Sequence, residues 1–196
     1  MSNKAASTRL MILQRSFELI YKKGYQATSI DDIIATTQVT KGAFYYHFKS
    51  KDEMGLAMIK EVVYPGMYAA LIRPLLEAGD PLDAIYQMMK HLLLKDPFFQ
   101  VEHGCPAINL IDEMSPVNED FRKALLQLVL QWQEHIQAVL EKGQRKGRVG
   151  KHISPQQAAL FITSGYGGIR NMGKVFGKSC YKTYLQEFET YLQKLK

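Results

Sequence analysis

The chain lacks most of the features that mark secreted, membrane-bound or disulfide-stabilised proteins. It contains only two cysteines, Cys105 and Cys180, which is too few for a disulfide framework. We find no long apolar run and no apolar signal region near Met1, so we expect a cytoplasmic protein without membrane contact. Strand-like alternation and internal repeats are missing as well. With 46% hydrophobic residues the chain is nevertheless able to bury a core.

Motifs for catalysis and cofactor binding are also missing. There is no G-x-S-x-G, no P-loop and no G-x-G-x-x-G, and the glycines of 165–168 have the wrong spacing and no preceding strand. Glu102, His103 and Cys105 are residue types that bind metals, but no partner motif accompanies them. We therefore expect no enzyme activity, no cofactor and no metal site.

Acidic residues are scarce in one part of the chain. Residues 1–51 hold eight basic and three acidic residues, a net charge of +5, out of +6 for the whole protein. The remaining residues are almost neutral, with 17 basic and 16 acidic side chains. A basic segment attached to a neutral body is typical of a protein that binds nucleic acid through that segment.

The same basic segment contains a pattern of two short helices joined by a tight turn, over residues 28–48. Thr28 stands before an apolar run with Asp31 three residues later, which predicts a capping-box-like helix start. Thr40 is placed to cap the second helix. Three isoleucines recur at helical spacing and should face a core: Ile30, Ile33 and Ile34.

The second helix, 41–48, has two different faces. Phe44 and Phe48 are four residues apart and should point inward. Gly42 at its start allows another backbone to come close. The outward face carries groups that donate hydrogen bonds to phosphates or stack on sugars and bases, namely Lys41, Tyr45, Tyr46 and His47. This pattern predicts a helix-turn-helix whose second helix enters the major groove of double-stranded DNA.

The runs 27–33 and 39–53 resemble the DNA-binding domain of the tetracycline repressor (TetR) family, over about the first quarter of the chain. The resemblance implies an all-α protein with a three-helix helix-turn-helix domain, 1–50, and a helical ligand-binding and dimerisation domain, 51–196. It implies a homodimer that binds a palindromic operator and leaves it when a small-molecule effector binds. Carried over position by position, the family's DNA contacts fall on Thr28, Thr40 and Lys51 for phosphates, and on Lys41, Gly42, Ala43, Tyr45, Tyr46 and His47 for the recognition surface.

The remaining chain predicts further helices. The first helix should begin at Ser7 or Thr8 and end at Lys23, and a long helix should begin after Ser50 and be kinked or interrupted at 65–66. Other helices are expected near 81–95, 106–114, 118–144, 155–176 and 178–192. Asp80 and Ser154 are the predicted N-caps of two of them, each with proline at the first helical position. The helices of 118–144 and 155–176 look like the pair that TetR-family proteins use to dimerise as a four-helix bundle. Small residues in 164–168 also favour close helix approach there. A kinked monomeric helix is the alternative.

The effector site is expected among aromatic residues of the C-terminal part, which favour an apolar or aromatic ligand. The Gly104-Cys105-Pro106 sequence is similar to a subset of the family in which some members sense oxidants or electrophiles through this cysteine. The alternative is that Cys105 is a small buried residue at a tight turn. The candidate ligand-binding residues are Tyr86, Met89, Phe98, Phe99, Cys105, Trp132, Phe161 and Tyr166.

One alternative function belongs to a different class. A helical-bundle enzyme or small-molecule-binding protein could carry an incidental basic segment and never bind DNA. Salt-dependent binding to duplex DNA separates this alternative from a transcriptional regulator.

Overall fold

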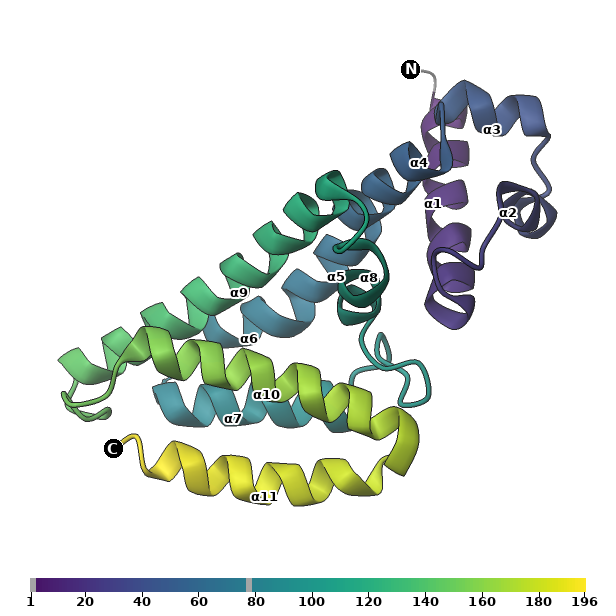
Figure 1. The fold of residues 1–196 in the computed structure, drawn as a ribbon. Helices are drawn as coiled ribbons and strands as arrows, with labels where there is room; N and C mark the ends of the chain where they lie inside the picture. The colour runs from purple at the N-terminus through teal and green to yellow at the C-terminus, as the bar shows by residue number, and fades with distance from the viewer. Residues whose placement is uncertain (1–2, 77–78) are drawn as a thin grey trace. The chain divides into compact units, whose positions relative to one another are not determined.

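The computed structural model describes residues 3–76 and 79–196, and every regular element in these ranges is helical, as predicted (Figure 1). The chain forms two compact units. The first contains residues 1–65 and 106–126, and the second contains residues 66–105 and 127–196. These units do not follow the division at residue 50 suggested by the sequence, because a later helix completes the first unit. The functional division into 1–50 and 51–196 stays a prediction.

The first unit is built on α1 (Asn3–Lys23), α2 (Ile30–Thr37), α3 (Lys41–His47) and α4 (Lys51–Met58). The helix α1 begins before the predicted Ser7 but ends where expected, since Gly24 follows with a φ of 91° that favours glycine. Short α8 (Pro106–Met114) and the beginning of α9 (Glu119–Arg145) complete this unit. Its buried core includes Ile12, Leu13, Ile33, Phe44, Phe48, Met54 and Phe121.

The helix that starts at Lys51 is not interrupted at Pro65, in contrast to one form of the sequence prediction. It continues through π-helical η1 (Ile59–Val63), α5 (Tyr64–Met67), π-helical η2 (Tyr68–Ile72) and α6 (Arg73–Leu76). In η1 the N–H of Tyr64 donates to the carbonyl of Ile59, five residues earlier. The wider π turns before and after Pro65 re-pair the backbone, so a residue without an N–H is tolerated within the helix.

The stretch Lys51–Leu76 is long and apolar enough to pass a length and composition test for a membrane span, with a mean hydropathy of 1.2. This differs from the expectation that the chain has no such stretch. However, 44% of the tested window is buried within the protein, and buried core helices pass the same test. The finding is therefore weak support for membrane insertion.

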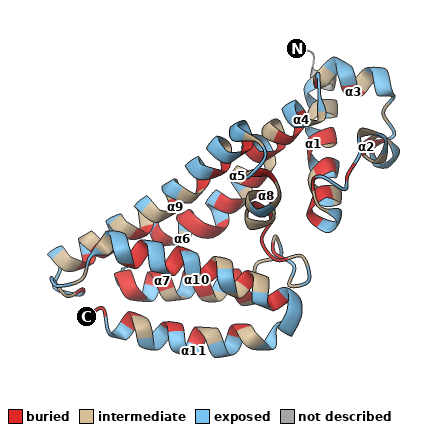
Figure 2. Cartoon of the chain, viewed as in Figure 1, coloured by how far each residue is buried: buried red, intermediate tan, exposed pale blue. Residues whose placement is uncertain are grey.

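The second unit contains α7 (Pro81–Leu94), most of α9, α10 (Pro155–Phe176) and α11 (Ser179–Gln193). Asp80 caps α7 and Ser154 caps α10, and each is followed by proline at the first helical position, as predicted. Figure 2 shows that α7, α10 and α11 are each buried along one side and exposed along the other. This amphipathic pattern packs the three helices around a shared core.

Candidate nucleic-acid interface and effector cluster

The helix α3 is held by a cap and by two buried phenylalanines. The Thr40 side chain accepts a hydrogen bond of 3.2 Å from the N–H of Ala43, as predicted. Phe44 and Phe48 are 0% and 1% exposed and anchor the helix to the first unit. Because these two residues fix the inner face, the opposite face of α3 has a defined orientation toward solvent.

The outer face of α3 is polar and aromatic. Tyr45 is 45% exposed and Tyr46 is 76% exposed. Lys41 is exposed and pairs with Asp31 at 3.1 Å, a surface ion pair that can exchange for a phosphate at little cost. A Cβ at Gly42 would meet only the Thr40 hydroxyl oxygen, at 4.0 Å, so the surface here is open. Two large exposed tyrosines on one helix face are suited to contacts with a nucleic acid.

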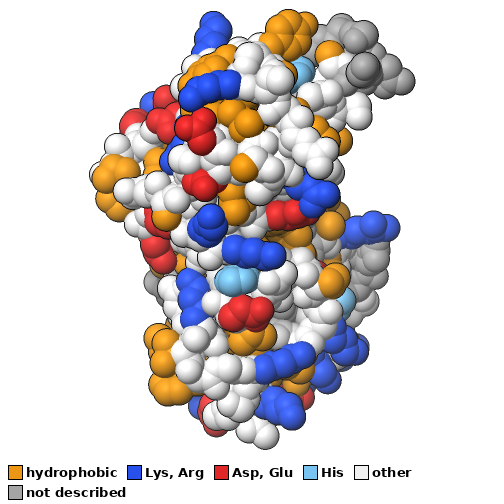
Figure 3. All heavy atoms as spheres, turned by 90° about the vertical axis from the view of Figure 1, so that its right-hand side faces the viewer, with side chains coloured by type: hydrophobic (Ala, Val, Ile, Leu, Met, Phe, Trp, Pro, Cys, Tyr) orange, Lys and Arg blue, Asp and Glu red, His pale blue; other side chains and the backbone are white. Residues whose placement is uncertain are grey.

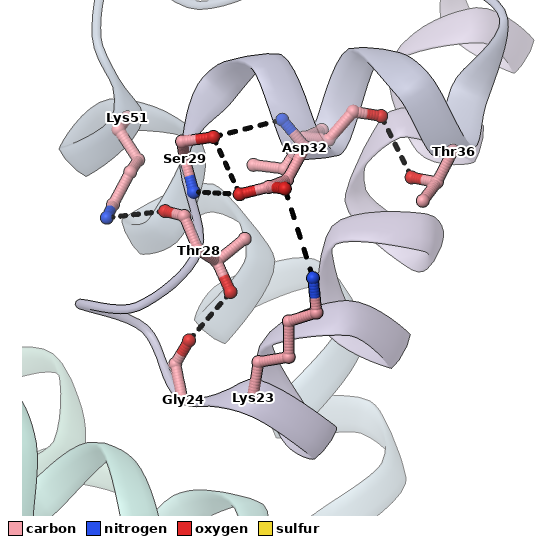
Figure 4. Close-up of polar contacts among 8 residues, drawn as sticks. Lys23, Gly24, Thr28, Ser29, Asp32, Thr36 and Lys51 are labelled. Carbon is pink, nitrogen blue, oxygen red and sulfur yellow. Dashed lines mark hydrogen bonds and ion pairs between the residues drawn. The ribbon is translucent and has the colours of Figure 1, made fainter.

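The start of α2 differs from the predicted cap. Ser29, not Thr28, is the N-cap, and its partner is Asp32, not Asp31 (Figure 4). The Ser29 hydroxyl and N–H both bond to the Asp32 carboxylate, at 2.6 and 2.9 Å. These bonds lower the pKa of Asp32. The reciprocal bonds between side chains and backbone form a capping box that fixes where α2 begins.

Thr28 has a structural role in place of the predicted phosphate contact. It is 0% exposed, its hydroxyl donates to the Gly24 carbonyl at 2.7 Å, and its N–H donates to the Tyr25 carbonyl at 3.2 Å. Both donors are therefore used inside the protein, and Figure 4 shows the bond from the hydroxyl to Gly24. Thr28 closes the turn between α1 and α2, and DNA cannot reach it in this conformation.

Lys51 lies at the start of α4 and fastens the same turn. Its Nζ donates to the carbonyls of Tyr25 and Thr28, at 2.8 Å each, and lies 4.4 Å from the centre of the Tyr25 ring. Figure 4 shows the bond to Thr28. Burial is the main cause that lowers the pKa of Lys51, and Asp52 partly opposes it. An ammonium group has three donors, so one N–H of Lys51 remains for a phosphate.

Basic side chains do not form a single patch on the face drawn in Figure 3. Lys and Arg side chains are spread over this face, with acidic and hydrophobic side chains between them. Long-range attraction can bring the protein to DNA, but it does not define the contact. The contact surface is better defined by the side chains of α3.

The second unit contains a buried aromatic cluster. The Tyr166 ring lies 5.2 Å from the Trp132 ring and 6.4 Å from the Phe99 ring, and each is nearly perpendicular to Tyr166. The Tyr166 hydroxyl accepts from Arg170 Nε at 3.3 Å and also bonds to Cys105. Burial, followed by the interaction with Cys105, raises the pKa of Tyr166 well above its usual value, so this phenol stays protonated.

Family models match most of the chain. Residues 12–58 match the model described as bacterial regulatory proteins of the tetR family. Residues 80–187, more than half of the chain, match the model of the tetracyclin repressor-like C-terminal domain. The chain belongs to the tetR family. It is a DNA-binding transcriptional regulator and not an enzyme, which confirms the function class and the resemblance inferred from the sequence.

Individual relatives agree with this assignment. A region of 130 residues is 39% identical to an uncharacterized HTH-type regulator of Lactococcus lactis, over 66% of each chain. The HTH-type transcriptional repressor DhaR of Mycobacterium sp. strain GP1 is 26% identical over 82% of this chain and 79% of its own length. A TetR-family regulator from Cytophaga hutchinsonii has the same fold, with a TM-score of 0.90 at 17% identity over 100% of this chain and 98% of that one. The crystal structure of reduced Escherichia coli NemR matches with a TM-score of 0.81 at 23% identity, over 94% of this chain and 96% of that one.

In this TetR-family regulator, most of the predicted effector residues lie together. Phe98 and Phe99 contact each other at a ring distance of 5.2 Å, and Phe99 extends the contact to the Trp132, Tyr166 and Cys105 group. Met89 is fully buried on α7. Tyr86 is half-buried and lies outside the cluster, where it lines a pocket with Asp80, Glu189 and Lys196.

Phe161 was predicted to line the effector site, but the structure places it elsewhere. It is 58% exposed and its ring lies 4.6 Å from that of Tyr191. The sequence showed only that an aromatic residue lay on α10, and α10 has aromatic residues on both its buried and its exposed sides. Which side of α10 a residue occupies depends on how the helix packs, and this decides whether the residue can line an effector site.

Two members of the cluster were not predicted, Arg170 and Tyr181. Both are 0% exposed. Arg170 lies four residues after Tyr166 on the buried stripe of α10, which also includes Ile162 and Gly173. An arginine at a stripe position of a mostly uncharged helix was a signal that the sequence did contain.

No group of three or more His, Cys, Asp or Glu side chains that could hold a metal occurs among the described residues. Neither cysteine forms a disulfide, and Cys105 is completely buried while Cys180 is partly accessible. The thiol at position 105 is thus shielded from reagents dissolved in water.

Proposed function

We propose that this protein is a homodimeric repressor of the cytoplasm that binds a palindromic operator through α3 of each protomer. The observation that carries the proposal is the outer face of α3, where Tyr45 and Tyr46 are exposed and Gly42 leaves the surface open. The recognition surface consists of Lys41, Gly42, Ala43, Tyr45, Tyr46 and His47, with Thr40 and the remaining N–H of Lys51 on phosphates. Thr28 is omitted because it is buried.

A dimer supports this function because two recognition helices must reach half-sites about one DNA turn apart. The helix α10 carries an exposed apolar stripe suited to self-association, formed by Phe161, Met172, Val175 and Phe176 around Ser164 and Gly168. Exposed apolar surface of this kind is unusual unless a partner covers it. We place the isologous interface on this stripe and on the exposed side of α9, where Leu130 is 38% exposed.

Effector binding would occur at the aromatic cluster of Phe98, Phe99, Trp132 and Tyr166, where an apolar or aromatic molecule finds matching walls. Because the cluster residues are packed against one another, a bound molecule must displace some of them. A coupling of about 1–3 kcal/mol would lower operator affinity roughly 5- to 150-fold.

Chemical modification of Cys105 is the second mode of release, in line with the Gly104-Cys105-Pro106 resemblance. The hydrogen bond between Cys105 and Tyr166 favours it, because an altered sulfur would disturb the same cluster. Complete burial of Cys105 favours release by effector binding at the aromatic cluster over release by thiol modification.

The proposal is tested by selecting genomic DNA fragments on the purified protein and measuring affinity for the enriched sequence against salt. We expect a palindrome and a steep loss of affinity as salt rises. Enrichment of no sequence, with binding that does not depend on salt, would favour the helical-bundle alternative. Release of wild-type protein, but not Cys105→Ser, by peroxide would select the thiol mode.

A further inference from the structure

Arg170 is a buried cation whose partners in the structure are all uncharged. Its Nη2 donates to the Leu92 carbonyl at the end of α7, and its Nε donates to the Tyr166 hydroxyl. The aromatic rings of Phe99, Tyr166 and Tyr181 surround the guanidinium, with their centres 4.6, 5.5 and 5.6 Å from its carbon. Within the part of the chain that the structure describes, no carboxylate forms an ion pair with Arg170.

The charge on Arg170 is retained despite its burial. Burial alone lowers the pKa of Arg170, but the oxygens of Tyr166 and Tyr181 outweigh it, so the net direction is upward. A buried cation without a counter-ion is costly, and rings and carbonyls offset only part of that cost. An apolar residue of similar volume would be expected at this position if packing were its only role.

Among the described residues, three buried groups of the same cluster lack a hydrogen bond of good geometry, although the Tyr181 oxygen lies near enough to the guanidinium to favour its charge. They are Nη1 of Arg170, Nε1 of Trp132 and the hydroxyl of Tyr181, all buried. All three side chains lie around the Tyr166–Arg170 pair, because Trp132 contacts the Tyr166 ring and Tyr181 contacts the guanidinium. Buried polar groups are almost always paired in native proteins, so these three groups are free to take an acceptor from outside, either water or a ligand.

The chemistry of these donors identifies the kind of acceptor. A carboxylate offers two oxygens that accept hydrogen bonds in the plane of a guanidinium, and it supplies the missing negative charge. Phe99, Trp132 and Tyr166 provide apolar surface for the rest of the molecule. A Cβ at Gly173 would collide with the Tyr181 hydroxyl, so this glycine leaves the space that the phenol occupies beside the guanidinium.

We propose that the effector of this regulator is a small carboxylate with an apolar or aromatic body, and that Arg170 binds its carboxylate group. The inference rests on the proposed function in one respect, that effectors enter this cluster. Arg170, Trp132 and Tyr181 supply the hydrogen bonds, and Phe99 and Tyr166 contact the body of the molecule. Entry separates Arg170 from the Leu92 carbonyl or moves the surrounding rings, which shifts α10 against α7.

The test uses the full-length protein and matched pairs of probes: benzoate and benzamide, phenylacetate and phenylacetamide, hexanoate and hexanamide. Each amide keeps the shape of its acid and removes the charge. In thermal unfolding, at least one carboxylate at millimolar concentration should raise the Tm of the wild type by several degrees, while its amide does not.

Two variants separate the proposed role of Arg170 from a structural one. Arg170→Met keeps much of the volume without the charge, and its Tm without ligand should equal or exceed that of the wild type. It should no longer respond to the carboxylate, and adding the carboxylate should no longer change its affinity for the selected operator. Tyr181→Phe removes one donor only and should weaken carboxylate binding several-fold.

The inference is overturned if amides raise the Tm as much as acids, if no carboxylate raises it, or if Arg170→Met responds like the wild type. It is also overturned if both variants lose their cooperative unfolding, because Arg170 and Tyr181 would then be structural. Failure of the wild type to bind any DNA contradicts the proposed function instead, and the thermal measurement on carboxylates remains independent of that result.

Discussion

Substitution of Lys51 offers a test in which stability and DNA binding are separated. The change Lys51→Met removes two hydrogen bonds of 2.8 Å and leaves the carbonyls of Tyr25 and Thr28 without this partner. It also removes the cation above the Tyr25 ring. These contacts hold the turn that precedes α2, so their loss should destabilise the first unit.

The expected magnitude follows from the two bonds. A hydrogen bond to a charged group contributes about 1.5–3 kcal/mol when buried, and less where water can replace it. Since the Lys51 side chain is only half-buried, we take a value below this range, about 1 kcal/mol per bond, which is typical of an ordinary hydrogen bond. Lys51→Met should therefore lower the free energy of unfolding by about 2 kcal/mol, measured by urea denaturation followed by circular dichroism.

Lys41→Met is the matched control, because Lys41 is exposed and has only the surface pair with Asp31. Its free energy of unfolding should stay within about 0.5 kcal/mol of the wild type. Lys51→Met should reduce the magnitude of the slope of log affinity against log salt by about 0.9 per protomer, because it loses one phosphate contact. If Lys51→Met is as stable as Lys41→Met, the structural role assigned to Lys51 is refuted. If its salt slope equals that of the wild type, Lys51 does not contact phosphate.

Three further predictions concern the second unit. Gly168→Leu should give monomers in sedimentation, because Gly168 has open space around it within the protomer. Gly165→Ala should stay dimeric, because a Cβ at Gly165 meets the Tyr184 hydroxyl of the same protomer, at 2.5 Å. A dimeric Gly168→Leu would argue against the α10 interface. Burial, with a contribution from Tyr191, raises the pKa of Tyr184 to about 12. The stability that the protonated Tyr184 phenol contributes is therefore complete below pH 10 and is lost as the pH rises toward 12. The difference in unfolding free energy between about pH 8 and pH 11, measured in urea, should be smaller in Tyr184→Phe than in the wild type. Iodoacetamide should modify Cys180 but not the buried Cys105 of native protein, as read by mass spectrometry, and rapid labelling of Cys105 would revive the thiol mode.

Helix starts were the most predictable part of the fold, because their signals are local. Thr40, Asp80 and Ser154 cap the helices that the sequence assigned to them. The cap of α2 was misplaced by one residue because Thr28 and Ser29 both carry a hydroxyl. Ser29 is the cap because the Thr28 hydroxyl is bonded to the Gly24 carbonyl, and that bond forms only when the turn after α1 is folded.

Features that depend on packing between distant segments were not predictable. Pro65 was expected to kink or interrupt its helix, but the flanking π turns accommodate it. Lys51 could be assigned to DNA from its position, yet its bonds to the Tyr25 and Thr28 carbonyls join segments 23 to 26 residues apart. The side of α10 on which Phe161 lies is likewise set by the helices packed around it.

The recognition surface was predicted more completely than the effector cluster. A short helix has only one outward face once Phe44 and Phe48 are assigned to the core, so Tyr45 and Tyr46 had to be exposed. The cluster draws on α7, α9, α10 and α11 and on the connector that holds Phe99. Its defining member, Arg170, becomes unusual only when its burial and its uncharged partners are known.

The central claim, that the outer face of α3 lies against DNA, is tested most directly by adding bulk where the protein itself leaves room. A side chain at Gly42 would meet nothing closer than the Thr40 hydroxyl at 4.0 Å, so Gly42→Leu should fold with unchanged stability or slightly better. Titration of the labelled operator at fixed salt should show at least a tenfold loss of affinity, because the leucine occupies the space of close approach to the bases. Wild-type affinity in Gly42→Leu would contradict the account.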